Sequence, residues 1–200
     1  MNLLGLGAGA IVGIILGGFV GLVVLFFVCW WLYVWACRNN FIRLKNNVEE
    51  AFSTMDVYMK KRYDLVPNLV ETVKGYTKHE STTLKEVVAA RNLAMNATPA
   101  EKAQAEAAFG KQLHTVVSAI AEQYPDLKAN SNFIDLQNQL KKLEEDIAYS
   151  RKYYNGTVKM YNNRVEMFPS NIVAKRYGFD KKEMFVVEDV EERKAVKVQF

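Results

Sequence analysis

The sequence predicts an all-α protein in which an N-terminal transmembrane helix continues into an elongated antiparallel bundle of about four long helices. Three observations lead to this fold class. Residues 1–37 contain no charged side chain. Beyond residue 38, apolar residues recur at steps of three and four, which is the period of an amphipathic helix. The chain's four prolines fall near the expected ends of these amphipathic stretches.

The segment from Leu3 to Cys37 is far longer than the roughly 18 apolar residues that identify a membrane helix. As one helix it would be about 52 Å long, against a hydrocarbon core of about 30 Å. Its aromatic cluster is typical of a membrane interface and consists of Trp30, Trp31, Tyr33 and Trp35, followed by Arg38. Counting back about 20 residues places the span near residues 11–30. The apolar residues 3–10 would then protrude and need a partner.

Glycine recurs at every fourth position of this segment, at Gly5, Gly9, Gly13, Gly17 and Gly21. Positions four apart lie on one face of a helix, and stripes of small residues let membrane helices approach closely. We therefore expect the glycine-striped transmembrane segment, residues 1–38, to be an assembly surface between copies of the chain. Two alternatives remain at this point: one long tilted anchor, or a hairpin that turns at Gly17–Gly18.

The distribution of basic residues predicts the orientation. No Lys or Arg precedes the span, whereas Arg38, Arg43 and Lys45 follow it closely. By the positive-inside rule, the N-terminus lies outside and the remainder of the chain is cytoplasmic. The missing basic n-region and the length of the apolar run argue against a cleaved signal peptide.

Charge and cysteine content exclude several functions for the remainder of the chain. All 26 basic and 22 acidic residues follow residue 37, with both signs interspersed. This pattern is typical of a solvated surface and not of a nucleic-acid-binding stripe. Both cysteines, Cys29 and Cys37, belong to the apolar segment, so we expect neither a disulfide nor a thiolate metal site in the soluble part. We expect no cofactor. The two histidines predict no metal site, because a zinc site needs about four convergent ligands.

The soluble part divides into a helical domain, residues 39–180, and a tail, residues 181–200, that can hold a short strand in which Met184 and Val186 share a face. In the domain, Pro67 is expected to interrupt the helix or to lie in the first turn of a second helix. Thr98 and Glu101 form a capping box for the third helix. The predicted helices cover residues 41–64, 67–95, 98–123, 131–167 and, as a short element, 171–177. The seam of the longest helix comprises Phe133, Leu136, Leu140, Leu143, Ile147, Ser150, Tyr154, Thr157, Tyr161, Val165 and Phe168.

Four sequence stretches resemble the bacterial LemA family. They are VEEAFSTMD from Val48, KRYDLVPNLVETVKGY from Lys61, EEDIAYSRKYYN from Glu144 and FPSN from Phe168. The resemblance covers roughly residues 40–180 and implies a bacterial inner-membrane protein with one N-terminal membrane helix and a cytoplasmic helical domain. It implies no catalytic residues. The glycine stripe is not part of the family's motif, so its role is inferred from this chain alone.

Two polar groups within these stretches are the candidate sites outside the membrane segment. One consists of Arg62, Tyr63, Asp64, Asn68 and Glu71, and the other of Arg151, Tyr154 and Asn155. They could converge into a ligand pocket. Alternatively, Asp64 and Asn68 cap the helix after Pro67, while the arginines and tyrosines fix the register of the bundle. We favour this structural interpretation, because buried polar networks often specify packing without chemistry.

The sequence therefore predicts a non-enzymatic, membrane-anchored homo-oligomeric scaffold that organises or shapes the bacterial inner membrane. Its expected partners are copies of itself and the lipid bilayer, and no nucleic acid. Two alternatives are an adaptor that docks another membrane protein, such as a protease, and an oligomeric pore. The span has no polar lining residues of the kind that water-filled pores usually show.

Overall fold

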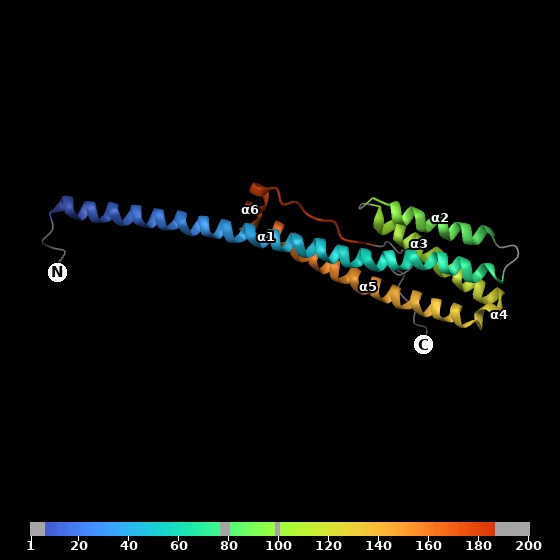
Figure 1. Cartoon of the computed structure of the whole chain (residues 1–200). Coiled ribbons are helices and arrows are strands. Elements are labelled where there is room, and N and C mark those ends of the chain that lie inside the picture. The colour runs from blue at the N-terminus through green and yellow to red at the C-terminus, as the bar shows by residue number, and fades with distance from the viewer. Residues whose placement is uncertain (1–6, 77–80, 99–100, 187–200) are drawn as a thin grey trace, which may run out of the picture. The chain divides into compact units, whose positions relative to one another are not determined.

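The computed structural model describes residues 7–76, 81–98 and 101–186, and every regular element in this part of the chain is an α-helix. The all-α prediction is therefore confirmed. Figure 1 shows the order of the elements along the chain. The helices are α1 (Ala8–Lys74), α2 (Ser81–Asn96), α3 (Lys102–Gln123), α4 (Pro125–Lys128), α5 (Ser131–Glu166) and α6 (Ser170–Tyr177).

Helix α1 runs without interruption for 67 residues, from the apolar segment into the soluble domain. It passes through Gly17–Gly18, where the hairpin alternative would turn. The expected break at Pro67 is wrong, because Pro67 lies inside α1. A proline in a helix leaves the carbonyl four residues earlier without its N–H donor, here that of Tyr63. Arg91 of α2 supplies the missing donor, since its Nε–H donates to the Tyr63 oxygen at 2.8 Å.

The starts of α3 and α5 use side-chain hydrogen bonds. The Glu101 carboxylate accepts from the Thr98 hydroxyl at 2.6 Å and from the Thr98 N–H at 3.4 Å, as the predicted capping box requires. These bonds lower the pKa of Glu101. The Asn130 side-chain oxygen accepts from the N–H groups of Asn132 and Phe133, at 2.9 and 3.4 Å, so Asn130 caps α5.

The chain divides into two compact units. The first comprises residues 1–46 and 160–182, and the second comprises residues 47–159 and 183–200. In the second unit, α2 and α3 pack together and share one hydrophobic core with parts of α1 and α5. Its most deeply buried side chains include Met55, Met59, Val73, Val87, Phe109, Leu127 and Phe133.

The predicted seam of α5 is mostly confirmed. Side chains from Phe133 to Tyr161 along the seam are buried or half-buried, including the polar Ser150 and Thr157. The prediction for the last seam residue, Phe168, is wrong. Helix α5 ends at Glu166, and Phe168 lies beyond this end with 78% of its surface exposed.

The first unit is built around Phe41 of α1. Its ring stacks on Phe179 at a centroid distance of 4.8 Å and meets Tyr161 of α5 edge-on at 6.2 Å. Helix α6 ends at Gly178, whose φ of +70° favours glycine. Residues 179–186 have no regular secondary structure. Residues 187–200 lie outside the described part, so the strand expected in the tail stays a prediction there.

The N-terminal part of α1 is the only described helix long and apolar enough to cross a membrane. Every side chain from Val12 to Leu32 is exposed, so none of the residues that the structure describes covers this segment. Exposure of so many large apolar side chains is typical of a helix whose solvent is lipid. The structure thus indicates a membrane anchor.

Candidate functional site

The glycine stripe lies on the exposed part of α1. A Cβ atom placed on Gly9, Gly13, Gly17 or Gly21 would meet nothing within 4 Å, so no packing against residues 7–76, 81–98 or 101–186 requires glycine there. Gly5 lies outside the described residues. The four glycines are spaced four apart on a continuous helix and so share one face. This face leaves room for another helix, and its role in assembly stays a prediction.

The aromatic cluster coincides with the start of packing within the chain. Trp31 and Trp35 are exposed, whereas Tyr33 is half-buried and Cys37 is the first buried side chain. Arg38 lies over the ring of Tyr177 at 5.4 Å. The expected membrane interface therefore falls where α1 first meets the remainder of its own unit.

The first polar group is divided by burial. Arg62 and Tyr63 are buried, whereas Asp64, Asn68 and Glu71 are exposed. The capping role expected of Asp64 and Asn68 is wrong, because α1 does not begin or end near them. Glu71 instead pairs with Lys74, one helical turn away, at 3.4 Å.

Arg62 forms a buried ion pair with Glu106 of α3, a residue that the sequence analysis missed. The guanidinium also lies over the ring of Phe109 at 5.1 Å. Gly110 gives it space, since a Cβ there would lie 3.3 Å from Arg62 Nη1. The sequence does contain a signal for this buried pair. Glu106 is the only charged residue in the alanine-rich stretch 103–110, and it precedes Gly110, a glycine inside a helix, by four residues.

Lys102 is the second buried charge that the sequence analysis missed. Its ammonium group donates to the carbonyl of Ala94 at 3.0 Å and lies 3.8 Å from a carboxylate oxygen of Asp56. It also lies over the Tyr63 ring at 5.4 Å. Together with Arg62 and Glu106, these contacts tie α1, α2 and α3 together through charged side chains. Such a network fixes which helices pack and in which register.

Burial gives Glu106 a pH-dependent effect on stability. Desolvation raises the pKa of its carboxyl, Arg62 opposes the rise and Asp56 adds to it. The folded state therefore holds the proton up to a higher pH than the unfolded chain. The resulting stabilisation is complete below the ordinary value of about 4.5 and is lost as pH rises through the folded pKa.

We therefore expect Glu106→Gln to change the pH profile of stability. As pH is lowered from 7 towards 4, the wild type should gain melting temperature relative to Glu106→Gln. Thermal unfolding followed by circular dichroism across this range measures the difference. Parallel profiles for the two proteins would show that the carboxyl titrates normally.

The second polar group holds the start of the tail. Asn155 donates from Nδ2 to the Phe185 carbonyl at 3.1 Å and accepts from the Phe185 N–H at 2.8 Å. The Tyr154 hydroxyl donates to the Glu183 carbonyl at 3.0 Å, and Phe185 itself is buried in the core. Burial and Glu183 both raise the pKa of Tyr154. Arg151 is half-buried and lies one turn earlier on α5.

A second asparagine repeats this clamp in the other unit. Asn162 donates to the Lys182 carbonyl at 2.8 Å and accepts from the Lys182 N–H at 2.9 Å. Each asparagine thus binds the backbone of one tail residue through both of its amide atoms. Because these bonds involve backbone atoms, the clamps hold extended chain irrespective of the side chain.

The two polar groups do not form the single pocket that the sequence left open. The Tyr154 ring meets Phe52 of α1 at 5.7 Å. Phe52 precedes Arg62 by ten residues, which is about 15 Å along a helix. The structural interpretation of both groups therefore fits the contacts better than a ligand pocket does.

Loss of the Asn155 clamp is expected to free the tail. Asn155→Ala removes two hydrogen bonds and should lower local stability by about 1–3 kcal/mol. Limited proteolysis should then cut the chain after residue 180 several times faster, while α5 stays intact. Asn163→Ala is the matched control, because Asn163 is an exposed asparagine on the same helix. Equal cleavage rates for both variants would contradict the clamp.

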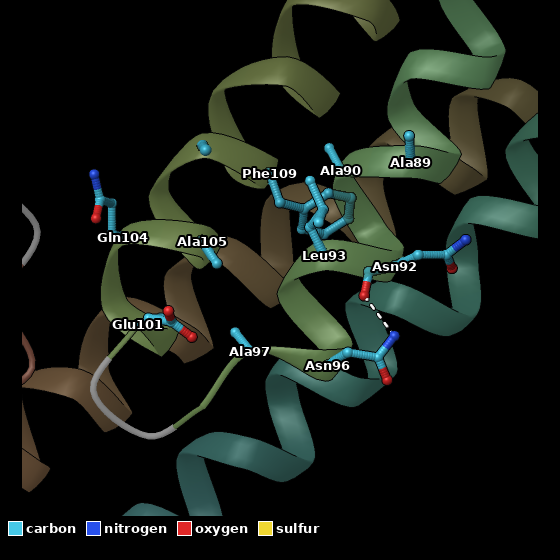
Figure 2. Close-up of a pocket in the computed structure, with 11 residues that line it drawn as sticks. Ala89, Ala90, Asn92, Leu93, Asn96, Ala97, Glu101, Gln104, Ala105 and Phe109 are labelled. Atoms are coloured by element: carbon cyan, nitrogen blue, oxygen red, sulfur yellow. Dashed lines mark hydrogen bonds between the residues drawn. The ribbon is translucent and has the colours of Figure 1, made fainter.

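A hollow of about 850 Å³ lies between α2 and α3 (Figure 2). Alanines from both helices, such as Ala90 and Ala105, make it shallow and apolar, and Leu93 stands beside it with 71% of its surface exposed. Its lining residues are Ala89, Ala90, Asn92, Leu93, Asn96, Ala97, Glu101, Gln104, Ala105, Ala108 and Phe109. Its chemistry suits an apolar side chain and not a charged ligand.

Comparison with known proteins identifies the family. The family model described as "LemA family" matches residues 51–200, which is three quarters of the chain. The chain belongs to the LemA family. The resemblance read from the sequence is thereby confirmed, and the matched region includes Arg62, Glu106 and both asparagine clamps.

Relatives of this LemA family member are distant. Protein LemA of Metamycoplasma hominis is 23% identical over 157 residues, covering 77% of this chain and 71% of the relative. Magnetosome protein MamQ 2 of Paramagnetospirillum magneticum and magnetosome protein MamQ of Magnetospirillum gryphiswaldense are each 22% identical over 173 residues. For these two, the match covers 74% of this chain but only 64% of the relative, so the chain spans under two thirds of their length.

Proposed function

We propose that this chain is a non-enzymatic scaffold of the bacterial inner membrane that assembles with copies of itself through the glycine face of α1. The observation that carries the proposal is the stripe at Gly9, Gly13, Gly17 and Gly21, where an added Cβ atom would meet none of the residues that the structure describes. Glycine in a helix interior is less favourable than alanine by about 1 kcal/mol. Close approach of a second membrane helix supplies a reason for retaining it.

The proposed topology is a single pass with the N-terminus outside and the helical domain in the cytoplasm. The positive-inside rule supports it, because Arg38, Arg43 and Lys45 follow the span and no basic residue precedes it. In this arrangement the domains of neighbouring copies lie on the same side of the membrane, where they can pack side by side. The relatives, two of them named as magnetosome proteins, come from bacteria, which supports the bacterial part of the proposal.

Leucine side chains on the glycine face are expected to dissolve the assembly. In Gly9→Leu/Gly13→Leu/Gly17→Leu, three bulky side chains keep a second backbone from approaching. Size-exclusion chromatography with light scattering in a mild detergent should show a several-fold fall in particle mass.

The matched control is Ile15→Leu/Leu22→Ile/Phe26→Leu, which changes exposed apolar residues on the opposite face while keeping the helix apolar. This control should retain the native mass. If the glycine variant also retains it, the stripe is not the interface.

A second candidate function is that of an adaptor for another membrane protein. The hollow between α2 and α3 favours it, because it presents an apolar surface and the exposed Leu93. A stoichiometric partner that is lost with Leu93→Glu, and kept when exposed Tyr149 is changed to Glu, would support the adaptor. A large homo-oligomer without such a partner would favour the scaffold.

A further inference from the structure

The corner between α5 and α6 exposes apolar side chains that no contact among the described residues covers. Met167 and Phe168 are 62% and 78% exposed, and Ile172 of α6 is 45% exposed. By contrast, Val173 and Ala174 are buried. Helix α6 therefore has one face packed into its own unit and an apolar face that the described part of the chain leaves exposed.

This corner belongs to the same compact unit as the membrane segment. Phe41 of α1 stacks on Phe179, and Arg38 lies over the ring of Tyr177 at the end of α6. Tyr161, in the last third of α5, meets the Phe41 ring edge-on at 6.2 Å. The C-terminal part of α5 and the end of α6 therefore contact α1 at residues 38–41, directly after the aromatic cluster, where the exposed apolar span ends.

Positive charge is concentrated in this unit. Residues 1–46 and 160–182 contain eight Lys and Arg residues and two carboxylates, a net charge of +6, whereas the whole chain carries +4. The remainder of the chain is therefore net negative. Lys175 and Arg176, both exposed, lie on α6 itself, beside the apolar residues.

From these observations we propose that residues 167–177 form an interfacial collar that binds the bilayer surface, with Met167, Phe168 and Ile172 among the acyl chains and Lys175 and Arg176 on anionic headgroups. A basic helix with an apolar face is the usual form of such contacts, and each cation near an anionic surface contributes. The partner is a lipid surface because the apolar residues are adjacent to a membrane span and carry cations complementary to its headgroups. The collar would fix the angle at which α1 leaves the bilayer.

Site-directed spin labelling of the full-length protein in nanodiscs tests the collar. In a Cys29→Ser background, the buried Cys37 stays unlabelled, and the label is placed at Phe168→Cys or, as a water-exposed reference, at Tyr153→Cys on α5. In discs of phosphatidylcholine with phosphatidylglycerol, collisions with oxygen should exceed collisions with a water-soluble nickel complex several-fold at residue 168. At residue 153, collisions with the nickel complex should exceed collisions with oxygen.

The two collision rates separate the possible outcomes. Contact with lipid raises the collision rate with oxygen and lowers the rate with nickel, whereas contact with another copy of the protein lowers both rates. The experiment therefore tests membrane binding by the collar separately from assembly of the scaffold. Low rates for both probes, or nickel access equal to that at residue 153, would overturn the proposal.

Charge reversal tests the headgroup contact. Lys175→Glu/Arg176→Glu should raise nickel access at residue 168 at least threefold in the anionic discs. Lys141→Glu/Lys142→Glu, two exposed lysines on α5, should leave it unchanged. If both double variants behave alike, anionic headgroups do not hold the collar.

Discussion

Replacing Arg62 by alanine is expected to destabilise the helical domain by about 3–5 kcal/mol at neutral pH. The change leaves the Glu106 carboxylate buried without its partner, and an uncompensated buried charge accounts for a loss of this size. It also removes the guanidinium that lies over Phe109 and fills the space above Gly110. Chemical denaturation of the full-length protein in detergent, followed by circular dichroism, measures the loss.

Two comparisons show whether this loss comes from the buried pair. Glu71→Ala removes half of the exposed pair with Lys74 and should cost no more than about 1 kcal/mol. Arg62→Leu/Glu106→Leu removes both charges and should recover much of the stability, because an apolar pair of similar volume avoids desolvation. A double variant as unstable as Arg62→Ala would mean that the pair contributes through shape and not through charge.

The second large effect is expected at Phe41. Phe41→Ala should destabilise the unit that joins the membrane segment to α6 by about 3–5 kcal/mol, because the ring is fully buried between Tyr161 and Phe179. The loss should be local. Hydrogen exchange of the amides of α6 should accelerate strongly, while the amides of α3, which lies in the other unit, stay protected.

Ile42→Ala is the matched control for Phe41, since Ile42 is its neighbour on α1 and is 39% exposed. This variant should cost less than about 1 kcal/mol and leave exchange of α6 nearly unchanged. If α6 stays equally protected in both variants, Phe179 and α6 are held by contacts other than the aromatic stack.

Most of the fold could be predicted from the spacing of apolar residues. The seam of α5 and the apolar segment follow directly from it. The continuity of the membrane helix with the soluble domain follows from the absence of glycine and proline between Gly21 and Pro67. The capping box at Thr98 and Glu101 is equally local, so the sequence alone reveals it. These features depend on residues within one or two turns of each other.

The errors arise where distant segments meet. Pro67 stays inside α1 because Arg91, from a different helix, donates to the carbonyl that the proline leaves free. The partner of Arg62 could not be predicted, because Glu106 lies 44 residues away on α3. In the tail, Met184 and Val186 suggested an apolar face, yet both are exposed and Phe185 between them is buried. The asparagine clamps set that orientation through backbone atoms, which leave no sequence pattern.

The central claim is that the glycine face of α1 assembles copies of this protein. Mass photometry of the full-length chain in a mild detergent, with single-particle imaging of the same sample, tests it most directly. We expect a discrete particle of many subunits whose membrane helices pack along Gly9, Gly13 and Gly17. A population of monomers or dimers would contradict it.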